Sequence, residues 1–140
     1  MLSINKCYTY NMFFLGIDFG EQNIGVAYAN DDITYPLEVI RNNKSTFEKI
    51  KEMVELYDVD VVVVGVADKK GGSIISKKAR KFGNALSQFI DIKVEYYDEN
   101  FSSKDAKVFA NELGYKQNRK IDDIAVAVLL QNYLDDKHNK

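Results

Sequence analysis

Five acidic residues of this chain stand where apolar stretches end or begin: Asp18, Asp98, Glu99, Asp122 and Asp123. A charged carboxylate beside so much apolar sequence costs several kcal/mol unless a cation compensates it. Carboxylate oxygens suit Mg²⁺ or Mn²⁺. Two such ions about 4 Å apart can activate a water and stabilise the leaving oxygen of a phosphodiester. The pattern therefore indicates metal-dependent phosphodiester hydrolysis.

The rare residue types exclude other kinds of site. Cys7 is the only cysteine, so neither an internal disulfide nor a Cys-rich zinc site can form. His138, the only histidine, lies in a polar segment, which argues against a Ser-His-Asp triad and a multi-His metal site. No apolar run is long enough to span a bilayer, and the first residues lack the pattern of a secretory signal. A reducing, cytoplasmic setting is expected.

Basic residues gather in two segments, although the chain of 140 residues carries a net charge of −2. By charge alone, such runs most often form a solvated helix face. Beside an acidic site they have a second use, because a carboxylate cluster repels nucleic acid unless nearby cations hold the phosphate backbone. The residues expected to bind nucleic acid are Lys77, Lys78, Arg80, Lys81, Lys116, Arg119 and Lys120.

Hydrophobic periodicity predicts the elements that position these acids. Strands are expected over 13–19, 24–29, 33–41, 59–64 and 92–97. Helices are expected over 46–57, 75–89, 102–113 and 122–135, with a basic loop over 115–121 before the last one. Pro36, the only proline, lies in the third strand and places that strand at an edge of the sheet.

The helices carry further signals. Ser45 and Glu48 have the spacing of a capping box at the start of the first helix. The last helix is apolar nearly all round, so it should be covered on more than one side. The second helix has an apolar stripe at helical spacing, formed by Ile75, Ala79, Phe82, Leu86 and Phe89.

This order of elements predicts an α/β fold with a mixed five-stranded sheet in the order 3-2-1-4-5, flanked by helices. Right-handed crossovers make the first, fourth and fifth strands parallel. In such sheets the site lies at the carboxyl ends of the strands, where Asp18 and Asp98 stand, and a helix beginning at Asp122 can join them. A single domain is expected over 12–136, with a loose leader over 1–11 and a polar tail over 137–140.

An ordered set of motifs then resembles one known family. The motifs are Gly16-Ile17-Asp18-Phe19-Gly20, Ile24-Gly25-Val26-Ala27, Tyr35-Pro36-Leu37, Val63-Val64-Gly65, Ala79-Arg80-Lys81-Phe82, Asp98-Glu99 and Ile121-Asp122. From Phe13 to Leu134 the chain resembles the YqgF/RuvX family, the Holliday-junction-resolvase-like nucleases of the ribonuclease H-like superfamily.

The resemblance implies an enzyme that trims the 5′ end of the 16S ribosomal RNA precursor, with branched DNA as the alternative substrate. Its catalytic and metal-binding acids would be Asp18, Glu99 and Asp122, holding Mg²⁺ or Mn²⁺. Asp98 and Asp123 would be neighbours rather than primary ligands. We expect structured RNA or branched DNA as the partner, no membrane, and a monomer or weak homodimer.

Three departures from the family pattern bear on how the substrate is held. Asn100 stands where the family usually has Arg, Glu21-Gln22-Asn23 replaces a turn that usually holds a basic residue, and Val66-Ala67 replaces Leu-Pro. A non-catalytic nucleic-acid-binding module of ribosome assembly is therefore the second hypothesis. A sugar-kinase or actin-like ATPase is the third, but that class needs two such domains and this chain has room for one.

Overall fold

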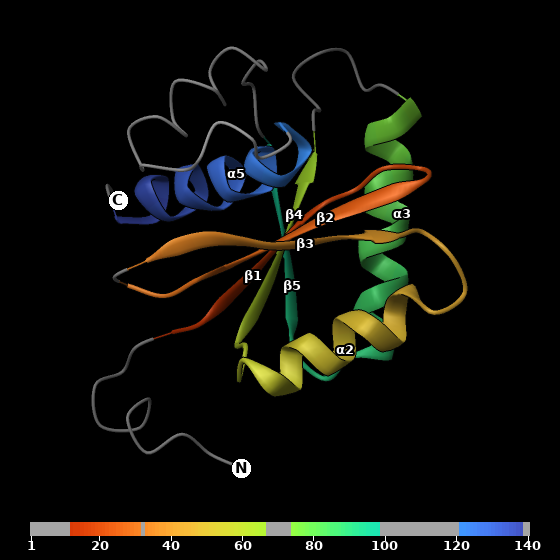
Figure 1. Ribbon diagram of the computed structural model, residues 1–140, viewed down its shortest axis with the longest axis horizontal. Helices are drawn as coiled ribbons and strands as arrows, with labels where there is room; N and C mark the ends of the chain where they lie inside the picture. Colours follow the sequence, from red (N-terminus) through yellow and green to blue (C-terminus); the bar gives the residue numbers. More distant parts are fainter. Residues whose placement is uncertain (1–11, 32, 67–73, 99–120, 139–140) are drawn as a thin grey trace.

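The computed structural model describes residues 12–31, 33–66, 74–98 and 121–138. Its strands are β1 (Phe14–Asp18), β2 (Asn23–Ala29), β3 (Thr34–Arg41), β4 (Val61–Val66) and β5 (Lys93–Asp98). Its helices are α2 (Thr46–Leu56), α3 (Ile74–Phe89) and α5 (Ile121–His138). The five strands form one sheet in the order β3-β2-β1-β4-β5, which confirms the predicted order and the position of β3 at an edge (Figure 1).

The strand directions also agree with the prediction. β1 pairs with β2 in the antiparallel sense and with β4 in the parallel sense, and β4 pairs in parallel with β5. The carboxyl ends of the parallel strands β1, β4 and β5 therefore lie side by side at the same end of the sheet. Asp18 is the last residue of β1, and Asp98 is the last residue of β5.

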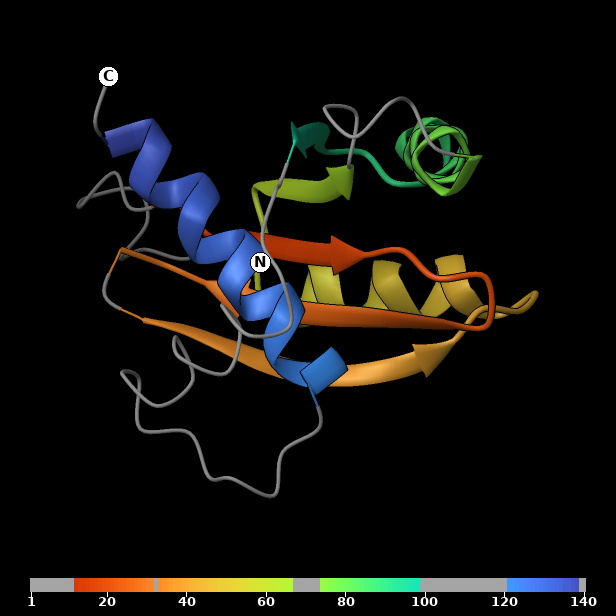
Figure 2. The ribbon, with the colours of Figure 1, turned by 90° about the horizontal axis from the view of Figure 1, so that it is seen from above.

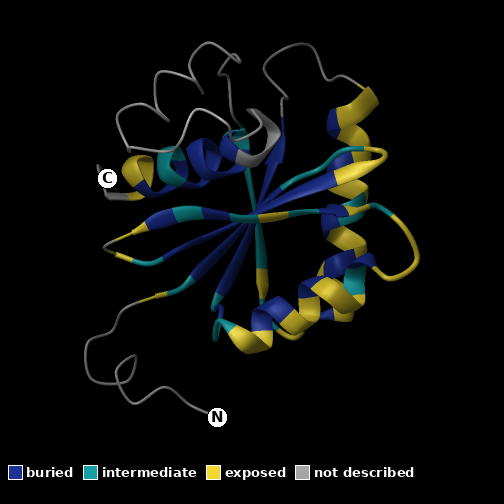
Figure 3. Ribbon diagram, viewed as in Figure 1, coloured by how far each residue is buried: buried dark blue, intermediate teal, exposed yellow. Residues whose placement is uncertain are grey.

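Helices cover both faces of the sheet. One core joins the strands to α2 and α3, and a second core joins the opposite face to α5. Figures 1 and 2 show that, among the described helices, α5 crosses one face, while α2 and α3 lie on the other. β1, β2 and β4 are buried where they cross the centre of the molecule, β5 is only partly buried, and many of the exposed residues lie on the outer sides of α2 and α3 (Figure 3).

Helix α5 packs very closely on β1 because the middle of that strand has no side chain. A Cβ atom added to Gly16 would lie 3.2 Å from the Cβ atom of Leu130. No residue from 124 to 134 is exposed, and Leu129 and Leu130 are completely buried. The expectation that this helix is covered on more than one side is confirmed.

The buried stripe of α3 differs from the predicted one. Its buried residues are Ser76, Ala79, Gly83 and Leu86. The predicted stripe members Ile75 and Phe89 are 40% and 39% exposed. The reason is the close approach of β5, since a Cβ atom on Gly83 would lie 2.7 Å from the Tyr96 ring. The small residues of α3 therefore face the sheet, and the larger ones are displaced toward the helix rim.

The predicted capping box of α2 is wrong. Ser45 occupies the N-cap position, but its side chain makes no capping hydrogen bond. The hydroxyl of Thr46 makes the side-chain hydrogen bonds at this end of the helix instead. It accepts a hydrogen bond from the Asn43 amide and donates one to the Arg41 carbonyl. Thr46 is 2% exposed, so this buried hydroxyl ties the end of β3 to the start of α2.

Several predicted features lie outside the described residues. These are the leader over 1–11, the helix over 102–113 and all but the last residue of the basic loop over 115–121. Helix α5 begins at Ile121 and ends at His138, one residue earlier and three residues later than predicted. No helix in the described part of the chain is long and apolar enough to cross a membrane.

A polar cluster joins the carboxyl half of α5 to β5. Tyr133 donates a hydrogen bond to Glu95, and Tyr97 donates one to Asp136. Lys93 forms an ion pair with Glu95 at 3.0 Å. Burial raises the pKa of Glu95, but the bonds from Tyr133 and Lys93 and the charge of Lys137 outweigh it and leave that pKa below its ordinary value.

The packing at Gly16 predicts a strongly non-additive pair of substitutions. Gly16→Val should destabilise the fold by about 1–3 kcal/mol, because its methyl groups meet Leu130. Leu130→Ala alone should cost about 2–5 kcal/mol. The double variant should cost less than the sum by roughly 1 kcal/mol or more, since the smaller Leu130 site admits the valine. Urea unfolding of the unmodified protein, the two single variants and the double variant measures these free energies. If the costs of the two single changes simply add, the contact between Gly16 and Leu130 does not set the spacing between β1 and α5.

The Glu95 cluster predicts a specific acid sensitivity. A carboxyl whose pKa is lowered in the folded state contributes stability above its unfolded pKa, near 4.3, and loses it as the pH falls through the lowered folded value. Glu95→Gln should therefore lower the melting temperature at neutral pH, and its difference from the unmodified protein should shrink below about pH 4. Glu55→Gln, at an exposed position of α2, is the control. A difference that stays constant down to about pH 2 would contradict this linkage.

Candidate active site

Asp18 lies at the carboxyl end of β1 and is half-buried. Side chains alternate along a strand. Leu15 and Ile17 belong to the core with α2 and α3, whereas Phe14 belongs to the core with α5. Asp18 is therefore directed to the same face as α5, just beyond the point where that helix packs on Gly16.

A hollow of about 330 Å³ opens beside Asp18. Its other lining residues come from the turn after β1 and from the two neighbouring strands, and they are Phe19, Gly20, Gln22, Asn23, Gly25 and Val39. Asp18 pairs with Gly25 across β1 and β2, and Gly25 pairs with Val39 across β2 and β3. The carboxylate and the hollow are thus positioned by three adjacent strands.

The turn between β1 and β2 is held from outside by Asn42, which follows β3. The side-chain amide of Asn42 donates to the Gly20 carbonyl at 3.0 Å, and its backbone amide donates to the Gln22 carbonyl at 2.8 Å. A Cβ atom on Gly20 would lie only 2.3 Å from the Asn23 carbonyl oxygen, so the tight turn requires glycine. The Phe19 ring packs on Phe82 of α3, with ring centroids 5.1 Å apart.

The other predicted acids are placed only in part. Asp98 is half-buried at the end of β5, while Glu99 lies outside the described residues. Asp122 and Asp123 belong to the first turn of α5, but the description does not extend to their side chains. Figure 2 shows the amino-terminal end of α5 directed toward the end of the sheet at which β1 ends. The elements that carry the acids therefore share one end of the molecule.

The donor chemistry at Asp18 fits a hard divalent cation. Carboxylate and amide oxygens are the ligands that Mg²⁺ and Mn²⁺ prefer, and the residues that line the hollow include neither His nor Cys. Within residues 12–31, 33–66, 74–98 and 121–138, no group of three acidic, histidine or cysteine side chains could hold a metal ion. The predicted triad is not tested by this result, because only Asp18 among its three side chains is described.

The predicted basic residues of α3 are all exposed: Lys77, Lys78, Arg80 and Lys81. Lys78 forms an ion pair with Glu21 in the turn after Asp18, with Nζ and Oε1 2.9 Å apart. Arg80 lies over the Tyr96 ring at 5.0 Å. The other predicted basic residues, Lys116, Arg119 and Lys120, lie outside the described residues.

The role of Glu21 was missed by sequence reasoning. From the sequence, Glu21 stands in a turn that usually holds a basic residue, which indicates the loss of a positive charge. In the structure Glu21 forms an ion pair with Lys78, which brings a cation to that turn. The two residues are 57 positions apart, and no local pattern connects them. Asn42 was missed for the same reason, since it lies 22 positions from Gly20.

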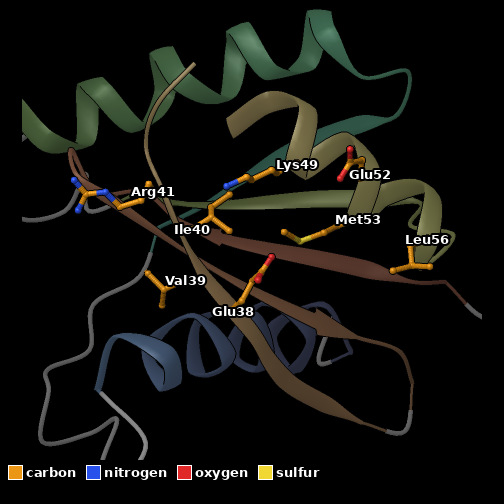
Figure 4. A pocket seen from close by; sticks show the side chains of 8 residues that line it. All are labelled: Glu38, Val39, Ile40, Arg41, Lys49, Glu52, Met53 and Leu56. Atoms are coloured by element: carbon orange, nitrogen blue, oxygen red, sulfur yellow. The ribbon is translucent and has the colours of Figure 1, made fainter. Parts of the chain in front are cut away.

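A second hollow, of about 490 Å³, lies between β3 and α2. Figure 4 shows Glu38 of β3 on one side of it, and Lys49 and Glu52 of α2 on the other. Ile40, which also lines it, belongs to the core with α2 and α3. This hollow therefore opens on the face opposite to the Asp18 carboxylate and is not part of the candidate active site.

Comparison with known proteins gives a consistent result at three levels. The family model described as RuvX, Holliday junction resolvase, matches residues 12–136. A relative from Caldanaerobacter subterraneus subsp. tengcongensis is 33% identical over 91% of this chain and 99% of its own length. A relative from Thermoanaerobacter pseudethanolicus is 30% identical over 92% of this chain and 100% of its own length. Both carry the provisional name pre-16S rRNA nuclease.

Solved structures with the same fold are Holliday junction resolvases. RuvC of T. thermophilus, in complex with a Holliday junction substrate, matches with a TM-score of 0.58 and 17% identity over 89% of this chain and 95% of that one. The fowlpox virus resolvase, in complex with Holliday junction DNA, matches with a TM-score of 0.62 and 19% identity over 89% and 98%. These likenesses confirm the predicted ribonuclease H-like fold.

The brace at Asn42 predicts a selective effect of an isosteric change. Asn42→Asp removes the donor to Gly20 and sets a carboxylate against a carbonyl, so it should destabilise the fold by about 1 kcal/mol and speed hydrogen exchange in the turn over 20–23. Asn30→Asp is the matched control, because the Asn30 side chain accepts its bond from the Ile33 amide and aspartate still can. Equal effects of the two changes on melting temperature and exchange would contradict a donor role for Asn42.

Proposed function

Since this chain belongs to the RuvX family of Holliday junction resolvases, we propose that it is a metal-dependent endonuclease that matures the 5′ end of the 16S ribosomal RNA precursor. Membership of that family makes the chain a hydrolase of phosphodiester bonds. Beyond this activity, we propose the substrate, the metal ion and the catalytic residues. The choice of substrate rests on the names of the curated relatives, which align over nearly their whole length.

The observation that carries the proposal is the position of Asp18. A half-buried carboxylate closes the central strand of the sheet, faces the side covered by α5 and lies beside an open hollow. β5 ends in Asp98 on the side of the molecule where β1 ends. Helix α5 begins at Ile121 on that same side. This arrangement suits a site in which acids from three elements converge on one phosphate.

In this proposal Asp18, Glu99 and Asp122 hold Mg²⁺ or Mn²⁺, and Asp98 and Asp123 are their neighbours. A bound divalent ion supplies positive charge that lowers the pKa of a water and stabilises the leaving oxygen. The protein contributes rigidity, because Asp18 is fixed by pairing with Gly25 on one side, and β1 pairs with β4 on the other. Preorganised ligands do not have to be ordered when substrate binds.

The substrate backbone is held by the basic residues on α3 and in the segment 116–120. Lys78 is the best placed of those described, because its ion pair with Glu21 keeps it at the turn that follows Asp18. An exposed ion pair contributes little to stability, on the order of 0–1 kcal/mol, so Lys78 can exchange Glu21 for a phosphate at small cost. Action on a ribosomal RNA precursor places the protein in the cytoplasm.

Branched DNA is the second candidate substrate. The description of the matching family, Holliday junction resolvase, favours it. Both substrates present a phosphodiester backbone to the same acids, so the two candidates differ in the shape recognised around the site and not in the chemistry.

A cleavage assay with a matched pair of variants tests the proposal. Full-length protein with Mn²⁺ or Mg²⁺ should cleave a 16S precursor RNA near its 5′ end, or a four-way DNA junction. Asp18→Asn, and Glu99→Gln in parallel, should lower the rate by roughly 100-fold or more. Their melting temperatures should stay equal or rise, because repulsion among the acids is relieved. Asp31→Asn, at an exposed turn after β2, is the control and should cleave normally.

Two results would overturn the nuclease assignment. One is binding of RNA without cleavage of either substrate in any divalent metal, which would leave a non-catalytic assembly module. The other is cleavage that persists in Asp18→Asn, which would place the chemistry elsewhere. Cleavage of the junction but not of the RNA would select the second candidate substrate.

A further inference from the structure

We propose that the hollow beside Asp18 is a nucleoside subsite, which holds the sugar and base of one nucleotide while the adjoining phosphate lies at Asp18. The inference rests on the proposed function and deepens it, because it states where the substrate strand lies relative to the catalytic acid. It concerns the residues of the turn over 21–23.

The shape of the hollow follows from the strand register. Asp18, Gly25 and Val39 are consecutive partners across β1, β2 and β3, so they share one face of the sheet. Gly25, between the carboxylate and Val39 in this row, has no side chain to extend into the hollow. The volume of about 330 Å³ lies at the lower end of the ~300–1,000 Å³ typical of small-molecule sites. It is of a size for one nucleoside and not for a duplex.

The charge of the lining selects which part of a nucleotide enters. None of the seven described residues that line the hollow is cationic, and Asp18 is an acid. A phosphate deeper in the hollow would meet no described cation, whereas at Asp18 the proposed divalent ion would compensate its charge, so the neutral sugar and base are favoured in the hollow itself. Two described cations lie near the hollow but outside its lining: Lys78 is bound at Glu21, and Arg41 pairs in register with Asn23.

The rim offers groups that recognise a neutral polar ligand. Gln22 and Asn23 are exposed, and each side-chain amide has both donors and an acceptor. Such amides pair with base edges and with sugar hydroxyls. Phe19 also lines the hollow, but its ring packs on Phe82 of α3, on the other face of the sheet, and so anchors the turn rather than the ligand.

The walls are held in place before any ligand arrives. Asn42 bonds the Gly20 and Gln22 carbonyls, and the turn at Gly20 admits no side chain. A preformed wall lowers the ordering cost of binding. The larger hollow between β3 and α2 has no comparable link to a catalytic acid, because it opens on the other face of the sheet.

Nucleotide titrations followed by NMR test the subsite without cleavage. Nucleoside 5′-monophosphates, added to the full-length protein in buffer with Mg²⁺, should shift the side-chain amides of Gln22 and Asn23 and the backbone amide of Gly25. The shifts should saturate with a dissociation constant on the order of 1 mM, as for one small subsite. Inorganic phosphate and ribose 5-phosphate should shift these signals much less, and the side-chain amide of Gln88, at the far end of α3, should not move.

Two variants make the assignment specific. Gly25→Val fills the hollow and should weaken nucleotide binding by roughly tenfold or more. If that change unfolds β2, the double variant Gln22→Ala/Asn23→Ala at exposed positions should still weaken binding several-fold at an unchanged melting temperature. Gln88→Ala is the control and should bind as the unmodified protein does.

The proposal is overturned if inorganic phosphate alone reproduces the shifts, if nucleotides shift signals elsewhere, or if the double variant binds with unchanged affinity. Its failure is distinguishable from failure of the nuclease assignment. A protein that cleaves without these shifts keeps the nuclease and loses the subsite, whereas one that shows the shifts and never cleaves keeps the subsite alone.

Discussion

The close contact between Gly16 and Leu130 is the constraint on which the arrangement of this protein depends. β1 is the central strand, and its face toward α5 is bare at Gly16, which lets the helix lie against the backbone. Asp18 follows two residues later on the same face. A helix held further from the strand would leave the same acid in open solvent and would carry its own first turn away from it. The glycine therefore sets the distance between the first and last elements of the fold.

Acidic and basic residues lie next to each other around the turn that follows Asp18. The proposed site would gather acids around Asp18, and an acidic site repels the polyanion that it is proposed to cut. The Glu21–Lys78 pair addresses this conflict, because the acidic residue in the turn holds a lysine from α3 at the point of approach. Phe19, Phe82 and the small residues of α3 keep that helix close to the sheet, so the basic surface stays next to the hollow. Packing and electrostatics thus act on the same turn.

The parts of the fold that the sequence predicts are those encoded by local periodicity. The β-branched run 61–64, the continuous apolar run before Asp18 and the proline in β3 suffice for the sheet order and its edge. The face of α3 was mispredicted because Gly83 admits Tyr96, and the cap of α2 because Thr46 bonds to Arg41. Both depend on a neighbour's position. The bonds from Asn42 and Lys78 to the turn join distant residues, so only the folded structure reveals them. Of the proposed acids, Asp18 is placed at the expected strand end, whereas Glu99 and the side chain of Asp122 stay predictions.

The position of α5 at the end of the chain also has a consequence for synthesis on the ribosome. Domains emerge from the amino terminus, so the meander of β1, β2 and β3 is available long before residues 121–138. Until those residues leave the exit tunnel, the face of β1 that bears Asp18 lacks the helix that covers it. In the proposed site, which joins Asp18 of β1 to the first turn of α5, the nascent chain therefore lacks one part of the site until α5 has left the ribosome.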